Sequence, residues 1–386
     1  MDSGIPLLLS GALLADGRTV DVRINSGRIE DIGAAGSLSA PDRLDLGGYL
    51  LLPAPVEVHA HLDEAFSATS APEPETVEVL QRRITEAALS GLGYGATVQR
   101  THVRVGGGHG LVRVEAALQA AKQLHGLMDL QVVALPGMLT GAAGAEGRAM
   151  LRDALAMGVH AVGGCPSLDP DPAGYLEFVN GQGGTVDLHG GDLSWLTGLA
   201  AGANLSPCGA LGLLPGGALR EAVALLAGIG CSVTCLPQSN RCTGEPRAAR
   251  VCAVPVGLLR AAGVAVAAGS GALRDAANPV GRVDPLEAAF LLAASGELDE
   301  TAAYAAVSSV ARGVLGLPPV GVEVGSPADL LAVRGESLRG VLSGGHSRVV
   351  VHGGRIVSRT SAVREYTDMT AAAVPRQGRS GPPDSP

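Results

Sequence analysis

The chain has 386 residues, of which 46% are hydrophobic, and its formal net charge is −9. This length and apolar content predict a folded globule with one large core or two modest ones. The acidic balance and the lack of any Lys/Arg cluster argue against a nucleic-acid partner, because phosphates need a basic surface. One Trp, five Tyr and three Phe leave few rings for a pocket that stacks flat ligands.

No leader and no membrane span are predicted. The apolar stretch Ile5–Leu9 has no basic residue before it, and no later run reaches spanning length free of glycine and charge. We therefore expect a cytoplasmic protein without a membrane partner. The cysteines are expected to be reduced thiols rather than a disulfide framework; they are Cys165, Cys208, Cys231, Cys235, Cys242 and Cys252.

The two ends of the chain predict β structure. Residues 6–50 predict short strands with a hairpin turn at Asn25–Gly27, and residues 320–358 predict further strands. Together they indicate a small β-sandwich domain built from both termini. The expected domain bounds are 1–53 and 318–370 for the small domain, 54–317 for the central domain and 371–386 for a disordered tail.

The central part repeats a short apolar run, a polar break and a helical stretch, which predicts a (β/α)8 TIM barrel. The predicted strands are Ala54–His61, Ala96–Val105, Leu130–Leu135, Ala161–Gly164, Thr185–His189, Ala203–Ser206, Ser232–Leu236 and Val264–Ala268. The clearest helical patterns are Glu75–Ser90, Leu111–Leu127, Gly147–Met157, Gly217–Gly228 and Pro285–Ala294. Only Gly174–Asn180 and Leu193–Ala201 are available as helices around the fifth strand.

The most informative feature of the chain is a pair of histidines at the end of an apolar run. His59 and His61 lie two positions apart in Val56–Asp63, and alternate side chains of a strand leave the same face. Two adjacent imidazoles could share one metal ion, whereas the plainer alternative is a strand end with two polar residues facing solvent.

Active sites of such barrels lie at the carboxyl ends of the strands, where the sequence has His59, His61, His102 and His189. We expect His59, His61 and His189 to hold one divalent ion, zinc or iron. An open position would remain for water, whose pKa the metal would lower. For His102 the alternatives are a hydrogen bond at the barrel mouth and a place in the substrate pocket.

Several segments resemble the amidohydrolase superfamily, and within it cytosine deaminase and its relatives. The segments are Pro53–Asp63, Arg100–Val103, Asp129–Ala134, Val162–Pro166, Val186–His189 and Asn278–Gly281. The first of them is the specific one, and the likeness covers most of the chain. The resemblance implies a barrel with a β-sandwich made from both ends. It also implies one metal ion that activates water for attack on a ring carbon, with release of ammonia.

The sequence departs from that family where its chemistry is concentrated. The resemblance implies a water-positioning histidine after Ser206, but Pro207 follows instead. It implies a metal-binding aspartate on strand eight, where Gly269–Ala272 has no carboxylate. The proton-shuttling glutamate is replaced by Asp192, and a substrate-binding glutamine by Gly137.

Because of these replacements, the resemblance does not assign the general base that takes up the proton of the attacking water. Three neutral histidines can hold zinc but cannot take up the proton of the attacking water, so Asp192 is the candidate catalytic residue. Asp63, Asp275 and Cys208 are further candidates, each with a plainer reading as a strand-end acceptor, a loop residue and a buried thiol. We assign Asp63 and His102 to the substrate pocket.

Three functional hypotheses follow. The first is a metal-dependent hydrolase of C–N bonds acting on a small, cyclic, nitrogenous substrate. The second is a catalytically silent barrel that binds or scaffolds, with a weak metal site or none, and the third is a non-hydrolytic enzyme using the same cavity. The expected partner is a small molecule, and assembly into a homo-oligomer is left open.

Overall fold

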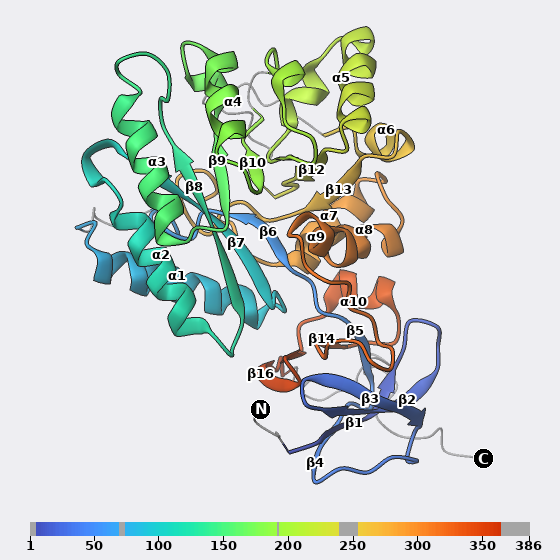
Figure 1. Cartoon of the computed structure of the whole chain (residues 1–386). Coiled ribbons are helices and arrows are strands. Elements are labelled where there is room, and N and C mark those ends of the chain that lie inside the picture. Colours follow the sequence, from blue (N-terminus) through green and yellow to red (C-terminus); the bar gives the residue numbers. More distant parts are fainter. Residues whose placement is uncertain (1–4, 69–73, 191–192, 239–253, 364–386) are drawn as a thin grey trace. The chain divides into compact units, whose positions relative to one another are not determined.

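The computed structural model describes residues 5–68, 74–190, 193–238 and 254–363 (Figure 1). The chain divides into two compact units, Met1–Ala54 with Pro319–Pro386, and Pro55–Pro318. No helix in the described ranges is long and apolar enough to cross a membrane. The tail predicted to be disordered, 371–386, lies outside the described residues.

The unit built from the two ends contains one eight-stranded sheet. Its order is β16-β15-β14-β5-β1-β2-β3, and β4 pairs with β1. The strands are β1 Leu7–Leu13, β2 Thr19–Asn25, β3 Arg28–Ala34, β4 Asp42–Asp45, β5 Tyr49–Pro53, β14 Leu330–Arg334, β15 Arg348–His352 and β16 Arg355–Thr360, with the helix α10 at Leu338–Gly344. The antiparallel pairing of β14 with β5 joins the two ends of the chain.

The predicted hairpin turn is confirmed between β2 and β3, where Asn25 pairs with Arg28. Ser26 and Gly27 both have positive φ, 50° and 76°. A two-residue turn with positive φ at both positions matches the right-handed twist of the strands, and glycine adopts that conformation without strain.

The second unit is a nearly closed barrel of eight parallel strands, which confirms the predicted fold class. Its strands are β6 Glu57–Ala60, β7 Val98–Val105, β8 Asp129–Pro136, β9 Ala161–Gly164, β10 Val186–Leu188, β11 Asn204–Leu205, β12 Ser232–Cys235 and β13 Ala265–Ala268. Gly271 closes the ring beyond β13, because its N–H donates to His59 O and its carbonyl accepts from His61 N.

Helices follow most strands and lie outside the sheet (Figure 1). They are α1 Val77–Gly93, α2 Val112–Leu124, α3 Ala145–Met157, α4 Pro172–Gly181, α5 Gly216–Gly228, α6 Val256–Ala261, α7 Pro285–Ala294, α8 Glu300–Val307 and α9 Ser309–Val314. In α1, Leu80, Ile84 and Ala88 recur every four residues and are buried, so one apolar face packs inward. Between β10 and β11 the described residues contain only the short 3-10 helix Leu196–Gly198, as the sequence predicted.

An apolar cluster of Val56, Val58, Val98, Ala267, Ala311 and Leu315 packs α9 against β6 and β13. A polar layer also lies in the barrel, formed by side chains from neighbouring strands. Its members are Arg100 on β7, Gln131 on β8, Asp187 on β10, Asn204 on β11 and Thr234 on β12. Barrel interiors are usually packed with branched apolar side chains, so this layer indicates a function beyond packing.

Candidate metal centre

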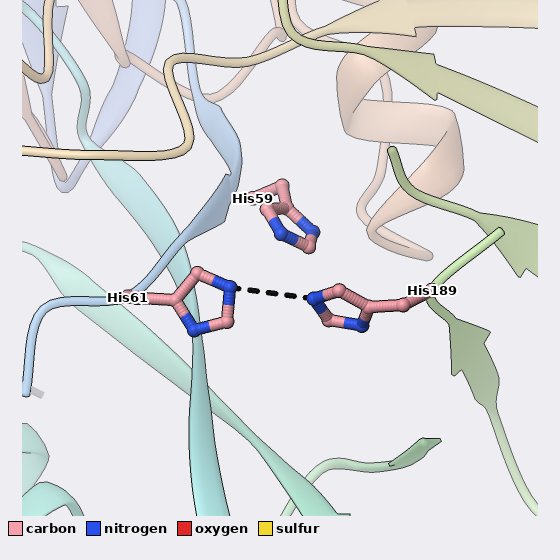
Figure 2. Close-up of side chains that lie close together, drawn as sticks. All are labelled: His59, His61 and His189. Carbon is pink, nitrogen blue, oxygen red and sulfur yellow. Dashed lines mark hydrogen bonds between the residues drawn. The ribbon is translucent and has the colours of Figure 1, made fainter. Parts of the chain in front are cut away.

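The structure brings His59, His61 and His189 together at the carboxyl ends of β6 and β10 (Figure 2). Their ring centroids are 5.2 Å apart for His59 and His61, 4.9 Å for His59 and His189, and 5.4 Å for His61 and His189. One nitrogen from each ring lies within 4.8 Å of the others. The structure thus brings together the three histidines that strand alternation and the barrel rule predicted to converge, and their role as metal ligands stays a prediction.

The arrangement fits a metal ion with imidazole ligands. His61 Nε2 and His189 Nε2 are 3.3 Å apart (Figure 2). Because zinc lies about 2.0–2.1 Å from a histidine nitrogen, two ligand nitrogens of a tetrahedral site are about 3.3 Å apart. His59 is fully buried, and neither of its ring nitrogens has a hydrogen-bond partner among the described residues. A buried polar atom without a partner is costly, and a metal ion would satisfy it.

The tautomer of His61 is fixed by its neighbour. His61 Nδ1 lies 3.1 Å from the main-chain oxygen of His102. A carbonyl only accepts, so Nδ1 carries the proton and the lone pair of Nε2 faces His189. This is the form in which a histidine binds a metal through Nε2.

Burial keeps the rings of His59 and His189 neutral. It lowers the pKa of His59 and of His189 well below the usual value, and the neighbouring histidines lower each pKa further. Metal ligands must be deprotonated, so both rings are ready to bind an ion at neutral pH.

A second group, His59, His102 and Asp187, also has ligand atoms within 4.8 Å of one another. Asp187 Oδ2 lies 2.8 Å from Arg100 Nη1, and both side chains are buried. A guanidinium this close repels a cation in a low-dielectric interior. The second group is therefore the weaker candidate for a metal ion.

Asp187 is held as a carboxylate. Burial alone raises its pKa, but His102 and Arg100 outweigh burial and hold the pKa of Asp187 well below its usual range. Asn204 Nδ2 donates to its other oxygen over 2.9 Å. Both oxygens of the Asp187 carboxylate therefore already accept hydrogen bonds, from Arg100 and from Asn204, and are not free to bind a metal ion.

Asp63 lies in an ion-pair cluster. Its Oδ2 is 2.7 Å from Arg113 Nη1, and Arg83 donates to its main-chain oxygen over 3.0 Å. Arg113 also contacts both oxygens of Glu75. Asp63 therefore has a structural partner, and its place in a substrate pocket stays a prediction.

The other residues considered for proton transfer lie in different surroundings. Asp192 falls outside the described residues. Asp275 Oδ1 accepts from the N–H groups of Ala277 and Asn278, which is a loop turn. Burial raises the pKa of the Cys208 thiol to about 12, so it is a poor base at neutral pH.

Glu57 is a buried residue of the candidate site that was not predicted from the sequence. Its side chain accepts from the N–H groups of His59 and Ser270, and burial raises its pKa to about 7 although these bonds lower it. Glu57, His59 and His61 alternate along one strand, and that spacing was the available signal. Arg100 could have been found in the same way, two residues before His102.

Comparison with known proteins finds relatives that match nearly the whole chain. No family model matches the chain. N-isopropylammelide isopropyl amidohydrolase of Pseudomonas sp. (strain ADP) is 25% identical over 420 aligned residues, covering 94% of this chain and 100% of that protein. The crystal structure of N-isopropylammelide isopropylaminohydrolase from Burkholderia multivorans is 26% identical, with a TM-score of 0.79 over 92% of this chain and 99% of that one.

A third relative shows the fold. The 5-methylcytosine deaminase of Klebsiella pneumoniae, solved with 5-fluorocytosine, has a TM-score of 0.79 and 21% identity, covering 94% of this chain and 99% of that one. The relative from Pseudomonas is named an amidohydrolase and matches over 94% of this chain, which confirms the resemblance to the amidohydrolases.

Proposed function

From its place among the amidohydrolases, we propose that this chain binds one divalent metal ion through His59, His61 and His189 and hydrolyses a C–N bond. The observation that carries the proposal is the convergence of three imidazoles with nitrogens within 4.8 Å. Three protein ligands with one open position are typical of catalytic rather than structural zinc sites.

A small, cyclic, nitrogenous substrate is the class we propose. One relative is named for an amidohydrolase reaction on N-isopropylammelide and another for deamination of 5-methylcytosine. We expect no turnover of cytosine at a rate typical of enzymes, because Pro207 and Gly137 stand where the resemblance implies a histidine and a glutamine.

The chain's own residues would prepare the site as follows. When bound, zinc or iron supplies the Lewis acidity that lowers the pKa of water toward neutrality. His61 is held by the His102 carbonyl, and burial excludes protons from His59 and His189. Proton transfer is assigned to Asp192, which follows the strand-five histidine by three residues.

A catalytically silent barrel is the second candidate. It is favoured by Ser206–Pro207 and by Gly269–Ala272, where the resemblance implies acid/base groups that this chain lacks. General acid/base help contributes about a hundredfold to ten-thousandfold in rate, so its loss would leave a slow enzyme or a binding protein.

Elemental analysis separates the two candidates. Protein purified without chelator should contain one equivalent of zinc or iron, and His189→Ala should contain none. His346→Ala, which removes an exposed histidine in the other unit, is the matched control and should keep the metal. Wild-type protein free of metal would favour the silent barrel.

Amine release then tests the hydrolase. The metal-loaded protein is offered a panel of amino-substituted triazines and pyrimidines, and released ammonia or alkylamine is measured. Turnover that Asp192→Asn abolishes while metal content stays the same would support the hydrolase and the assigned base. Metal binding without turnover of any ring would support a binding protein.

A further inference from the structure

We propose that His102 is a positioning residue for the metal ligands, anchored through Asp187 to Arg100, and that it does not contact substrate. The inference rests on the proposed function, because it concerns the same metal site. It also assigns a role to the buried polar layer that contains Arg100 and Asp187. The three proposed ligands by themselves do not explain why these polar side chains lie inside the barrel.

His102 lies beside all three proposed ligands, and its ring centroid is 5.3 Å from that of His189. Its main-chain oxygen lies 3.1 Å from His61 Nδ1 and so selects the tautomer that offers Nε2. Its ring centroid is 4.0 Å from that of His59, with the two ring planes tilted by 33°. Ring and carbonyl together limit how far His59 and His61 can turn.

The ring of His102 faces a buried carboxylate. His102 Nε2 lies 3.5 Å from Asp187 Oδ1, an electrostatic contact rather than a hydrogen bond, and neither ring nitrogen has a hydrogen-bond partner among the described residues. Asp187 in turn accepts from Arg100 and Asn204 over 2.8 and 2.9 Å. A carboxylate behind a histidine commonly orients metal ligands, and here the carboxylate acts one residue further from the ion.

Arg100 connects this anchor to the barrel wall. Its Nε and Nη2 donate to Gln131 Oε1 over 3.0 and 2.8 Å, and Gln131 Nε2 donates to the main-chain oxygen of Leu315. The guanidinium is 2% exposed, so none of these bonds competes with bulk water. The bonds fix Arg100, which fixes Asp187 and through it His102.

The same geometry argues against two other roles for His102, contact with substrate and ligation of the metal ion. Its side chain is fully buried, so it has no surface to offer a substrate. Its ligand atoms group with those of His59 and Asp187 rather than with all three proposed ligands. An ion held by His59 and His102 would need Asp187 as its third ligand, and Arg100 already pairs with that carboxylate over 2.8 Å.

The test is metal affinity in His102→Phe. Phenylalanine keeps a ring of similar size and the main-chain carbonyl but removes both nitrogens. Cobalt(II) and zinc are titrated against a chromophoric chelator, and the visible spectrum of the cobalt form reports its coordination. We expect binding 10- to 100-fold weaker than wild type, with an altered cobalt spectrum.

Tyr175→Phe is the matched control. Tyr175 is also fully buried and loses one hydrogen bond, from its hydroxyl to Pro136 O, which involves none of His102, Asp187 and Arg100. It should bind cobalt(II) as wild type does. The urea midpoint of the metal-free proteins shows whether each variant folds.

If His102→Phe does not fold, Arg100→Met/Asp187→Asn tests the same inference, because it removes both charges together and leaves neither one buried alone. Affinity equal to wild type in either folded variant would overturn the inference. Wild-type protein that binds no cobalt(II) or zinc would instead overturn the proposed function, and this inference with it.

Discussion

Arg113 holds together one buried and two partly exposed carboxylates. It contacts Asp63 over 2.7 Å and Glu75 over 2.6 Å, and Glu64 lies 3.6 Å away. Burial raises the pKa of Asp63, and Glu64 raises it further, while Arg113 opposes both. Arg113→Met should therefore lower the free energy of unfolding by about 3 kcal/mol, measured by urea titration, because it leaves a buried carboxylate unpaired.

Arg18→Met is the control for that change. Arg18 pairs with Asp16 over 2.8 Å, but both side chains are more than half exposed. Exposed ion pairs contribute little, so this variant should stay within about 0.5 kcal/mol of wild type. Equal losses in the two variants would show that the Asp63 cluster has no special role.

The second prediction at the residue scale concerns the reactivity of the buried cysteines. The four that the structure describes are free, and burial raises the pKa of Cys208 and of Cys235 to about 12. A raised pKa means less thiolate: roughly one in 10,000 at pH 8, against about one in four at the usual pKa. Neither should react with iodoacetamide in the native protein.

Mass spectrometry of the labelled peptides checks this. Cys165 is half-buried and should be labelled first among the described thiols, although burial raises its pKa too. Labelling of Cys208 and Cys235 should appear only in denaturant or at strongly alkaline pH. Rapid native labelling of either at pH 8 would contradict the buried placement.

At the residue scale, the three proposed ligands could be predicted because each depends on a local rule. Alternation pairs His59 with His61, and the barrel rule puts His189 at the same end. The Arg100 to Asp187 ion pair joins residues 87 apart in sequence, and no local pattern specifies that contact.

At the element scale, strand existence was predictable, but strand length was predicted unevenly: β9 has the predicted bounds Ala161–Gly164, and β6 does not. The sequence predicted a first barrel strand over Ala54–His61, but β6 covers only Glu57–Ala60, and its register with β7 shifts between these two residues. The helix expected at Gly174–Asn180 is longer, because Asp171 caps it by accepting from Gly174 N and Pro172 starts its first turn.

A capping residue also stabilises α8. Asp299 is exposed and accepts from Ala302 N over 2.8 Å at the first turn of that helix. Asp299→Ala should cost about 1 kcal/mol in the free energy of unfolding, whereas Asp299→Ser, which can still accept, should cost much less. Equal losses for both would show that the cap is not the cause.

At the scale of the whole molecule, the barrel followed from alternating strand and helix patterns, since each strand was visible by itself. The terminal sheet was harder to predict. Its ends were visible as β structure, but the order that puts β14 beside β5 pairs Leu330 with Pro53 and Arg334 with Tyr49. Such pairings are set by packing over the whole chain rather than by the residues near each strand.

Metal removal should change the stability of the whole protein. An ion that binds only the folded state stabilises it by mass action, so free zinc at one hundred times its dissociation constant should add about 2.7 kcal/mol to the free energy of unfolding. Thermal unfolding of chelator-treated protein, with and without zinc, measures the gain. His189→Ala should lose it, and His346→Ala should keep it. Equal stabilisation of His189→Ala would place the ion elsewhere than among His59, His61 and His189.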